Sequence, residues 1–263
     1  MRAAGGRRTA KTPLTSRPSF WWGLFTVVVI VLGGGAIAAI TVIAPTKIAA
    51  TKSYPPMTPA PARTPSLDRT ALSIDDPMSL WLVVDKLRPL NPVSWVPKDL
   101  TQVDVPSNYG AYMRAPAALQ LKRMFDDYTT LNPGRSLKVL SSYRSYETQK
   151  SVWDGNYTLT ALPGHSEHQT GMAVDIGAGT NKCGIQICFA DQPEGQWLAA
   201  NAHKYGFVLR YPLGKENITG YQFEPWHFRY VGAVLAWYML NTKTQTLEEV
   251  FNLPAAPKYA NQK

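Results

Sequence analysis

The sequence contains few of the residues from which most metal and redox sites are built. Only four histidines and two cysteines occur among 263 residues. Cys183 and Cys188 lie five positions apart, and no further cysteine or histidine pair follows at the spacing of a zinc finger, so a thiolate zinc site is not expected. In an oxidising compartment the two cysteines would close a small loop as a local disulfide, and otherwise they are two inert thiols.

The chain also lacks the patterns that accompany nucleotide or nucleic-acid binding. It has no glycine-rich phosphate loop, no base-stacking motif and no internal repeat. Its net charge is +9, but five basic residues and no acidic residue lie within the first nineteen positions. These five are Arg2, Arg7, Arg8, Lys11 and Arg17. Because the remainder carries little excess positive charge, we expect no nucleic-acid partner.

Charged residues are absent altogether between positions 20 and 43. This segment, FWWGLFTVVVIVLGGGAIAAITVI, is 24 residues long, which exceeds the ~20 residues that a helix needs to span a bilayer. Trp21 and Trp22 stand at its start, where interfacial aromatic residues are common, and the basic arm of residues 1–19 indicates a cytoplasmic N-terminus. The sequence therefore predicts a single transmembrane anchor at residues 20–43, with the chain after it outside the cytoplasm.

A cleaved signal peptide is the alternative explanation of this apolar segment. Its cleavage site would be the A-x-A sequence of Ala36, Ile37 and Ala38. The apolar cores of signal peptides run ~7–15 residues, whereas this segment is longer and stays apolar beyond Ala38. We therefore favour the anchor, although both alternatives place the rest of the chain in an extracytoplasmic compartment.

Composition divides the remaining chain into three parts. Residues 44–72 contain six prolines among alanine, threonine, serine and lysine, a composition typical of a semi-extended linker. Residues 254–263 are polar and contain proline, so we expect a flexible tail there. The stretch between them, 73–253, is predicted to form one domain.

Helical and strand patterns both occur in this domain without alternating regularly. Helices are expected over about 116–128, from the cap Ser145 to about Trp153, from a capping box of Asp191 and Glu194 to Gly206, and from about Gly232. Extended segments are expected at 137–143, 207–211 and 221–230, the last interrupted by Pro225. This mixture predicts an α+β fold with a largely antiparallel sheet and flanking helices.

Three of the four histidines fall in two short segments, GHSEHQTGMAVDIG at residues 164–177 and EPWHFRY at 224–230. A hydrolytic zinc site has three protein ligands, drawn from imidazoles and a carboxylate, and leaves one position for water. His168, Asp175 and His227 supply such a set. Because His168 precedes a glycine turn and Asp175 follows it, the intervening chain could return both side chains to one point.

Glu224 is the candidate general base because it stands three residues before His227. In a regular strand these two side chains would face opposite ways, but Pro225 lacks a backbone donor and disfavours a regular ladder. A bend at Pro225 would bring Glu224 beside the metal without making it a ligand. The carboxylate could then take a proton from metal-activated water.

The remaining candidates each have a structural and a functional interpretation. His165 could replace His168 as a ligand or merely line the cleft, and we favour His168. His203 is expected on a solvent-facing helix. Arg144 follows a predicted strand, where it could form a surface salt bridge or point into the cleft to hold a carboxylate or an oxyanion. Gln149, about a turn into the next helix, could shape this region or meet the substrate.

Taken together, these segments resemble the VanY-type D-alanyl-D-alanine carboxypeptidases, which are zinc peptidases of the bacterial cell wall. The resemblance extends from about Leu82 to Tyr238. It includes the segments LVVDKLRPLNPVSWVPKDL, SSYRSYETQ, PGHSEHQTGMAVDIG, YGFVLRYP and ITGYQFEPWHFRYVG. The S-x-H-x-x-G-x-x-x-D core and the E-P-W-H block are highly specific together, whereas the CGIQIC segment is not part of the motif and could shape the rim of the cleft.

The resemblance implies both a fold and a metal site. The fold would be related to the zinc-bearing domain of hedgehog proteins. The zinc ligands of the family match His168, Asp175 and His227, and its catalytic base matches Glu224. The implied cofactor is therefore Zn²⁺.

The resemblance also implies a substrate and a cellular location. Arg144 matches the arginine that stabilises substrate and transition state, while Ser166 and Gln149 match positions that line the substrate site. The implied reaction is removal of the terminal D-alanine from peptidoglycan stem peptides. The enzyme would be anchored by one helix in the bacterial cell membrane, with its catalytic domain outside.

Three alternatives share most of these motifs. An L,D-carboxypeptidase acting on tetrapeptide stems would use the same ligands. A zinc-bearing module that binds the wall without turnover would also keep them, but it would have no need of the base Glu224. An endopeptidase that cuts cross-bridges is the weakest of the three.

Overall fold

The computed structural model describes most of the chain beyond the first part of the linker. The described residues are 54, 56–57, 60–61 and 66–262. The cytoplasmic arm and the transmembrane anchor that the sequence predicts lie outside them. Within the described part, no helix is both long enough and apolar enough to cross a membrane.

An antiparallel sheet of four strands forms the centre of the domain. Its strands stand in the order β3-β4-β6-β5, and every neighbouring pair is antiparallel. These strands are β3 (Leu137–Ser141), β4 (Ala173–Ala178), β6 (His227–Tyr230) and β5 (Phe207–Leu209). Two further strands pair separately, β1 (Leu100–Val103) with β2 (Ala111–Arg114). The predicted α+β fold with an antiparallel sheet is therefore confirmed.

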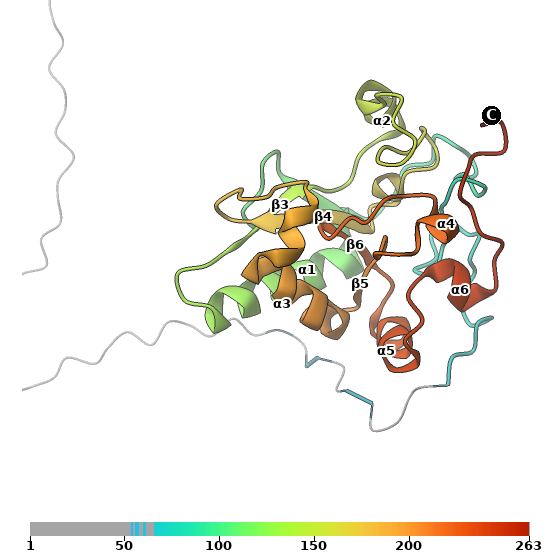
Figure 1. The fold of residues 1–263 in the computed structure, drawn as a ribbon. Coiled ribbons are helices and arrows are strands. Elements are labelled where there is room, and N and C mark those ends of the chain that lie inside the picture. The colour runs from blue at the N-terminus through green and yellow to red at the C-terminus, as the bar shows by residue number, and fades with distance from the viewer. Residues whose placement is uncertain (1–53, 55, 58–59, 62–65, 263) are drawn as a thin grey trace, which may run out of the picture. The chain divides into compact units, whose positions relative to one another are not determined.

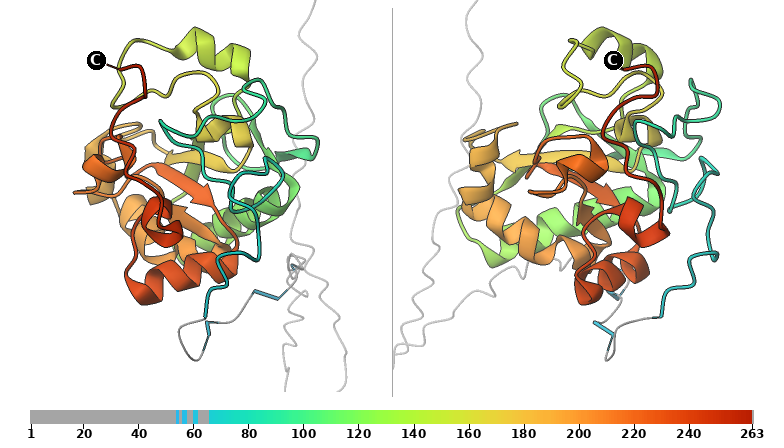
Figure 2. Two further views of the ribbon diagram at one scale, coloured as in Figure 1. Left: turned by 90° about the vertical axis from the view of Figure 1, so that its right-hand side faces the viewer. Right: turned by 45° about the vertical axis from the view of Figure 1, so that its right-hand side comes forward.

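Helices surround this sheet, as Figures 1 and 2 show. The α-helices of the described part are α1 (Ala115–Leu131), α2 (Tyr146–Val152), α3 (Pro193–Asn201), α4 (Glu216–Thr219), α5 (Ala233–Thr242) and α6 (Leu247–Phe251). Three 3₁₀ turns are η1 (Glu167–Thr170), η2 (Ile187–Asp191) and η3 (Ala202–Tyr205). In both figures α1 and α3 lie on one side of the sheet, and α2 lies on the other.

Helix α1 carries the apolar face that the sequence predicts. Its buried residues are Ala117, Ala118, Leu121, Met124, Phe125 and Tyr128. They share one core cluster with Val139 of β3, Ile176 of β4 and Phe228 of β6. Burying one large apolar side chain contributes roughly 1.5–3 kcal/mol. This layer therefore holds β4 and β6 firmly from one face and leaves their other face available.

The helix caps were predicted with mixed success. Ser145 caps α2 as expected, since its hydroxyl accepts a hydrogen bond from Thr148 N at 3.1 Å. Helix α5 begins directly after Gly232, also as expected. Helix α6 was not predicted, although Thr246 and Glu249 form a complete capping box at its start.

The start of α3 differs from the sequence prediction. Its N-cap is Gln192, without a side-chain cap, so the capping box proposed for Asp191 and Glu194 is wrong. Glu194 is buried and its carboxylate pairs with Arg135 at 3.2 Å instead. The predicted end is confirmed, because η3 continues the helical path to Gly206, whose φ of 79° terminates it.

The C-terminal residues pack against the domain as far as the structure describes them, to residue 262, which corrects the expectation of a flexible tail at 254–263 for that part. Tyr259 is only 6% exposed, and its hydroxyl accepts a hydrogen bond from Leu162 N at 2.9 Å. The Lys86 ammonium lies 5.5 Å from the centre of the Tyr259 ring. The expectation rested on polar composition, which does not reveal that Tyr259 is buried and that Ala256 N donates a hydrogen bond to the Ile218 carbonyl at 2.7 Å.

The end of the predicted linker also contacts the domain. Leu67 packs against the cluster that contains Trp81, and Arg69 Nε donates a hydrogen bond to the Val250 carbonyl in α6. Residues 66–72, which composition assigns to the linker, are therefore attached to the domain. Proline content alone did not reveal these contacts.

Replacing Tyr259 with alanine should lower the free energy of unfolding by about 3 kcal/mol, because a buried ring and its hydrogen bond are lost. Lys258→Ala is the matched control: its exposed side chain lies one residue away, and its loss should change stability by less than ~0.5 kcal/mol. Urea denaturation followed by tryptophan fluorescence measures both values. Equal stability of the two variants would show that the tail is loose after all.

Candidate active site

The predicted metal ligands meet on the face of the sheet that α1 leaves uncovered. His168 lies in η1, Asp175 in β4 and His227 in β6. His168 Nε2 is 3.2 Å from Asp175 Oδ2, and His227 Nδ1 is 3.1 Å from Asp175 Oδ1. One donor atom from each residue lies within 4.8 Å of the other two, and all three side chains are buried. The structure thus brings the whole predicted set together.

A glycine turn places His168 beside the strand that follows it. Gly171 ends η1 with a φ of 69°, a left-handed conformation that favours glycine. A Cβ added there would lie 3.0 Å from side-chain atoms of both Arg114 and Leu100. The chain can therefore reverse tightly between His168 and Asp175, as the spacing predicts, although the turn is a 3₁₀ segment rather than a hairpin.

Strand register brings the other two ligands together. Asp175 and His227 are direct partners in the antiparallel pair of β4 and β6, and side chains at such positions lie on the same face. Their neighbours Val174, Ile176 and Phe228 point to the opposite face and belong to the core. The alternation of the strands thus separates the metal site from the core.

The bend expected at Pro225 is present. His227 N donates a hydrogen bond to the Glu224 carbonyl at 3.1 Å, which closes a turn just before β6. As a result Glu224 Oε2 lies 3.7 Å from His227 Nδ1, on the same side of the chain. The carboxylate is therefore beside the ligand set and outside it, where a general base is needed.

The donor set suits zinc. Two imidazoles and one carboxylate match the ligand chemistry of hydrolytic zinc sites, which keep a further position for water. His168 Nδ1 lies 2.8 Å from the Ser142 carbonyl, and a ring N–H directed there leaves the Nε2 lone pair for a metal. Although burial opposes ionisation of Asp175, His168 and His227 hold the pKa of that carboxyl well below its usual range. It is therefore an anionic ligand.

A cavity of about 170 Å³ opens beside these ligands. Its lining residues are Arg144, Leu159, Thr160, Ala161, Ser166, Glu167, His168, Asp175, Ile185, Tyr211, Tyr221, Glu224, Trp226 and His227. Within the described part of the chain, Arg144 Nε and Glu224 Oε1 are buried without a hydrogen-bond partner. Such atoms are costly unless something else satisfies them. A polar substrate group in this cavity would do so.

The pKa values of the groups around the cavity are shifted in different directions. Burial raises the pKa of Glu224 to about 8, although His227 and Arg144 oppose the rise. Burial also lowers the pKa of the Arg144 guanidinium, while Asp175 and Glu224 favour its charged form. For His227, burial is outweighed by hydrogen bonds to Asp175 and Glu167, so its pKa is raised to about 9. Strongly perturbed groups in a cleft are typical of catalytic sites.

The other predicted residues lie in different places around the cavity. Ser166 lines it, whereas Gln149 does not: its fully buried side chain donates a hydrogen bond from Nε2 to the Ala161 carbonyl at 2.7 Å. Gln149 therefore supports a wall of the cavity from behind, and direct contact with substrate stays a prediction. His165 Nδ1 lies 2.8 Å from the Asp85 carbonyl, away from the ligand set.

The fourth histidine and the cysteines have structural positions. His203 is half-buried in η3 and stacks edge-on against Trp237, with ring centres 4.5 Å apart, so it is less exposed than predicted. Cys183 and Cys188 form a disulfide, as expected. This disulfide closes a loop from which Ile185 reaches the cavity, so the loop does shape the cleft.

Sequence reasoning gave no role to Glu167, Tyr211 or Trp226, which also line the cavity. All three belong to segments that carry the family resemblance, and this position within the motifs is the signal that could have revealed them. The ring of Tyr211 lies 4.8 Å from that of His227. Together with Glu167 and Trp226, this ring forms part of the cavity wall near His227 of β6.

Comparison with known proteins places this arrangement in a family. The family model VanY, D-alanyl-D-alanine carboxypeptidase, matches residues 110–233. YodJ of Bacillus subtilis (strain 168) is 39% identical over 193 residues, which cover 68% of this chain and 69% of YodJ. The structure of the LdcB LD-carboxypeptidase is similar with a TM-score of 0.61 and 38% identity, covering 67% of this chain and 87% of LdcB.

A third similar protein is the vancomycin-resistance D,D-pentapeptidase VanY from a VanB-type cassette, solved as a mutant in complex with Zn(II). It is 30% identical, with a TM-score of 0.52, over 64% of this chain and 96% of that one. The fold and the site define a metallopeptidase-type domain. The chain belongs to the VanY family of D-alanyl-D-alanine carboxypeptidases.

Replacing His168 with alanine should weaken zinc binding by more than about 100-fold, because the loss of a ligand should exceed the 10–100-fold cost of losing an outer partner. His203→Ala is the matched control, since it removes an imidazole outside the ligand set and should leave the affinity unchanged. Competition with a chelating dye measures both. Equal affinities in the two variants would contradict the assigned ligands.

Proposed function

We propose that this chain is a zinc-dependent D-alanyl-D-alanine carboxypeptidase that removes the terminal D-alanine from peptidoglycan stem peptides. The observation that carries the proposal is the placement of Glu224 beside the His168, Asp175 and His227 set, with Arg144 lining the same cavity. A ligand set alone could serve binding. A buried carboxylate next to it, without being part of it, supports hydrolysis.

The residues of the cavity divide the reaction between them. Zinc, when bound, supplies a Lewis acid and lowers the pKa of water at its open position to about 7. Glu224, whose ionised form a bound dication would favour, accepts the proton of the attacking water and then passes it to the leaving amine of D-alanine. Arg144, with its unsatisfied buried Nε, donates hydrogen bonds to the developing oxyanion or to the terminal carboxylate.

Resemblance in sequence supports a D,D-specific enzyme, and one structural similarity supports the alternative. LdcB, with a TM-score of 0.61, is an LD-carboxypeptidase, whereas the VanY structure is that of a D,D-pentapeptidase. Both are similar to this chain over about two thirds of its length. An L,D-carboxypeptidase that uses the same residues on tetrapeptide stems is therefore the second candidate.

Product analysis separates the two candidates. The protein, loaded with zinc, would be incubated with defined pentapeptide and tetrapeptide stems, and the products identified by mass spectrometry. We expect loss of one alanine from the pentapeptide. Loss only from the tetrapeptide would establish L,D-specificity. If neither peptide is cut although one zinc is bound per chain, a binding module without turnover would replace the enzyme.

We also propose that residues 20–43 anchor the protein in the bacterial cell membrane, with the catalytic domain outside. The length of the uncharged segment and the basic arm before it support this location. An enzyme held there would lie next to its substrate in the wall. Recovery of the full-length chain with membranes, released by detergent and not by salt, would support the anchor, whereas a shortened soluble product would indicate cleavage.

Replacing Glu224 with glutamine should lower kcat by about 10²–10⁴-fold, because the amide cannot accept the proton of the attacking water. Zinc should still bind, since Glu224 is not a ligand. Glu147→Gln, at an exposed position in α2, is the matched control and should retain full activity. Substantial hydrolysis by the Glu224 variant would remove this residue from the mechanism.

A further inference from the structure

A second carboxylate, Glu167, contacts one of the metal ligands from behind. Its Oε2 lies 3.3 Å from His227 Nε2, on the opposite side of the ring from Asp175 and Glu224. The Glu167 side chain is 0% exposed. Because His227 Nδ1 faces Asp175 at 3.1 Å, the two ring nitrogens have two different carboxylate partners.

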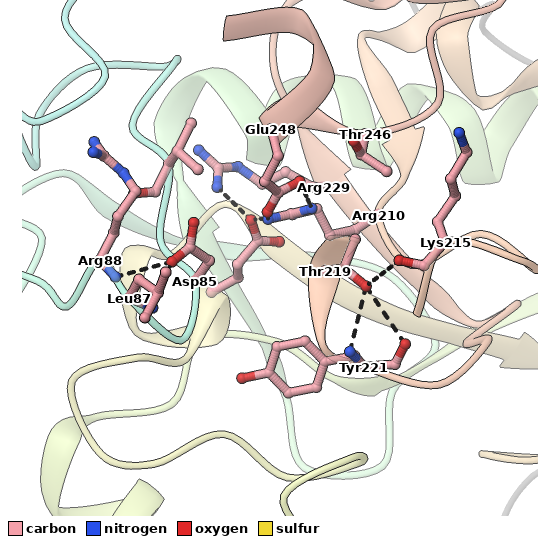
Figure 3. Close-up of polar contacts among 12 residues, drawn as sticks. Asp85, Leu87, Arg88, Arg210, Lys215, Thr219, Tyr221, Arg229, Thr246 and Glu248 are labelled. Atoms are coloured by element: carbon pink, nitrogen blue, oxygen red, sulfur yellow. Dashed lines mark hydrogen bonds and ion pairs between the residues drawn. The ribbon is translucent and has the colours of Figure 1, made fainter. Parts of the chain in front are cut away.

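Two arginines hold Glu167 in place. Its Oε1 accepts hydrogen bonds from Arg210 Nε at 2.8 Å and from Arg229 Nη1 at 2.9 Å. Arg210 also makes two hydrogen bonds to Glu248, at 2.9 and 2.6 Å, and Arg229 Nη2 donates to the Leu82 carbonyl at 2.7 Å. Figure 3 shows the side chains of Arg210, Arg229 and Glu248 gathered at one point.

The position of Arg229 follows from the strand. It comes two residues after His227 on β6, so both side chains lie on the same face of the sheet. The two arginines balance Glu167 and Glu248 in charge, and all four side chains are at most 1% exposed. Burying four charges is seldom the most stable solution for a core. This cluster therefore calls for a functional explanation.

Two guanidinium groups donate to Glu167, and a carboxylate paired in this way is ionised. Its other oxygen, Oε2, is the atom that faces His227 Nε2. An ionised carboxylate only accepts hydrogen bonds. His227 Nε2 must therefore carry a hydrogen toward Glu167, which leaves the Nδ1 lone pair for a metal when the ring is neutral.

His168 has the opposite arrangement. Its Nδ1 is directed at the neutral Ser142 carbonyl, and its Nε2 faces Asp175. The two ligand histidines thus present different nitrogens to one point. Neutral imidazoles in water exchange between both tautomers, so each ring needs its own partner to fix the correct one. For His227 that partner is Glu167.

We propose that Glu167, held by Arg210 and Arg229, is a positioning residue that fixes His227 with Nδ1 toward the zinc and strengthens zinc binding. This inference rests on the zinc site of the proposed function and is independent of which peptide is cut. The competing explanation is that the four charges only stabilise the fold. The two explanations differ in what happens to zinc affinity when one carboxylate charge is removed.

Glu167→Gln is a sharp test because of its neighbours. Arg210 and Arg229 both require an acceptor at the position of Oε1, so the amide oxygen will turn toward them. The amide NH₂ then faces the N–H at His227 Nε2, so that two hydrogen-bond donors oppose each other. The ring is driven to the other tautomer, with hydrogen on Nδ1, and zinc affinity should fall about 10–100-fold, the usual cost of losing such a partner.

Glu248→Gln is the matched control. It removes a buried carboxylate charge from Arg210 in the same cluster, but no hydrogen bond or ion pair links Glu248 to His227 within the described residues. Both variants should lose thermal stability. Zinc affinity is measured by competition with a chelating dye. Of the two variants, only Glu248→Gln should keep an affinity within threefold of that of the natural protein.

Each outcome has one meaning. A tenfold or larger loss of zinc affinity in Glu167→Gln, with little change of zinc affinity in Glu248→Gln, supports the positioning role. Equal losses, or no loss in Glu167→Gln, overturn it and leave a structural cluster. If the unaltered protein binds no zinc, the proposed function itself fails, which is a distinguishable result.

A second measurement needs no variant and so avoids any failure to fold. In the ¹⁵N-labelled, zinc-loaded protein, two-bond ¹H–¹⁵N correlations of the histidine rings report which nitrogen carries hydrogen. We expect His227 with hydrogen on Nε2 and metal on Nδ1, and His168 with the reverse. Metal on Nε2 of His227 would contradict the proposal directly.

Discussion

The candidate site depends on one pairing, that of β4 with β6 in the register that sets Asp175 opposite His227. A shift of this pairing by one residue would turn a whole row of side chains to the other face of the sheet. Val174 and Phe228 would then face the cavity, and the ligands would enter the core. The packing of α1 against the apolar face specifies the register. The strand register that packs the core is therefore also the register that forms the metal site.

The same register organises the charges on the other face. His227 and Arg229 alternate with Phe228 along β6, so one strand supplies a ligand, a core residue and a partner of Glu167. Glu224 stands at the bend that precedes this strand. Because each buried oxygen of Glu167 has a partner, the cluster avoids the heavy penalty of an unsatisfied buried charge.

Sequence patterns predict the features that depend on neighbouring residues, and they miss contacts between residues that are distant in the sequence. The α1 face, the Ser145 cap and the ligand set are encoded by spacing and short motifs, and the structure contains each of them. The ring of Tyr259 was missed because its slot is built from distant residues. Glu194 was misassigned for the same reason, since its partner Arg135 lies far back in the chain.

Specificity has to be sought in the walls of the cavity, because the ligands, base and arginine match those implied for the whole family. One wall is the segment 159–161, which Gln149 holds through the Ala161 carbonyl and which Tyr259 secures through the neighbouring Leu162 amide. A second is the disulfide-closed loop that presents Ile185. Segments outside the catalytic motifs thus shape the cavity that would receive the proposed stem peptide, whereas the motifs carry the chemistry.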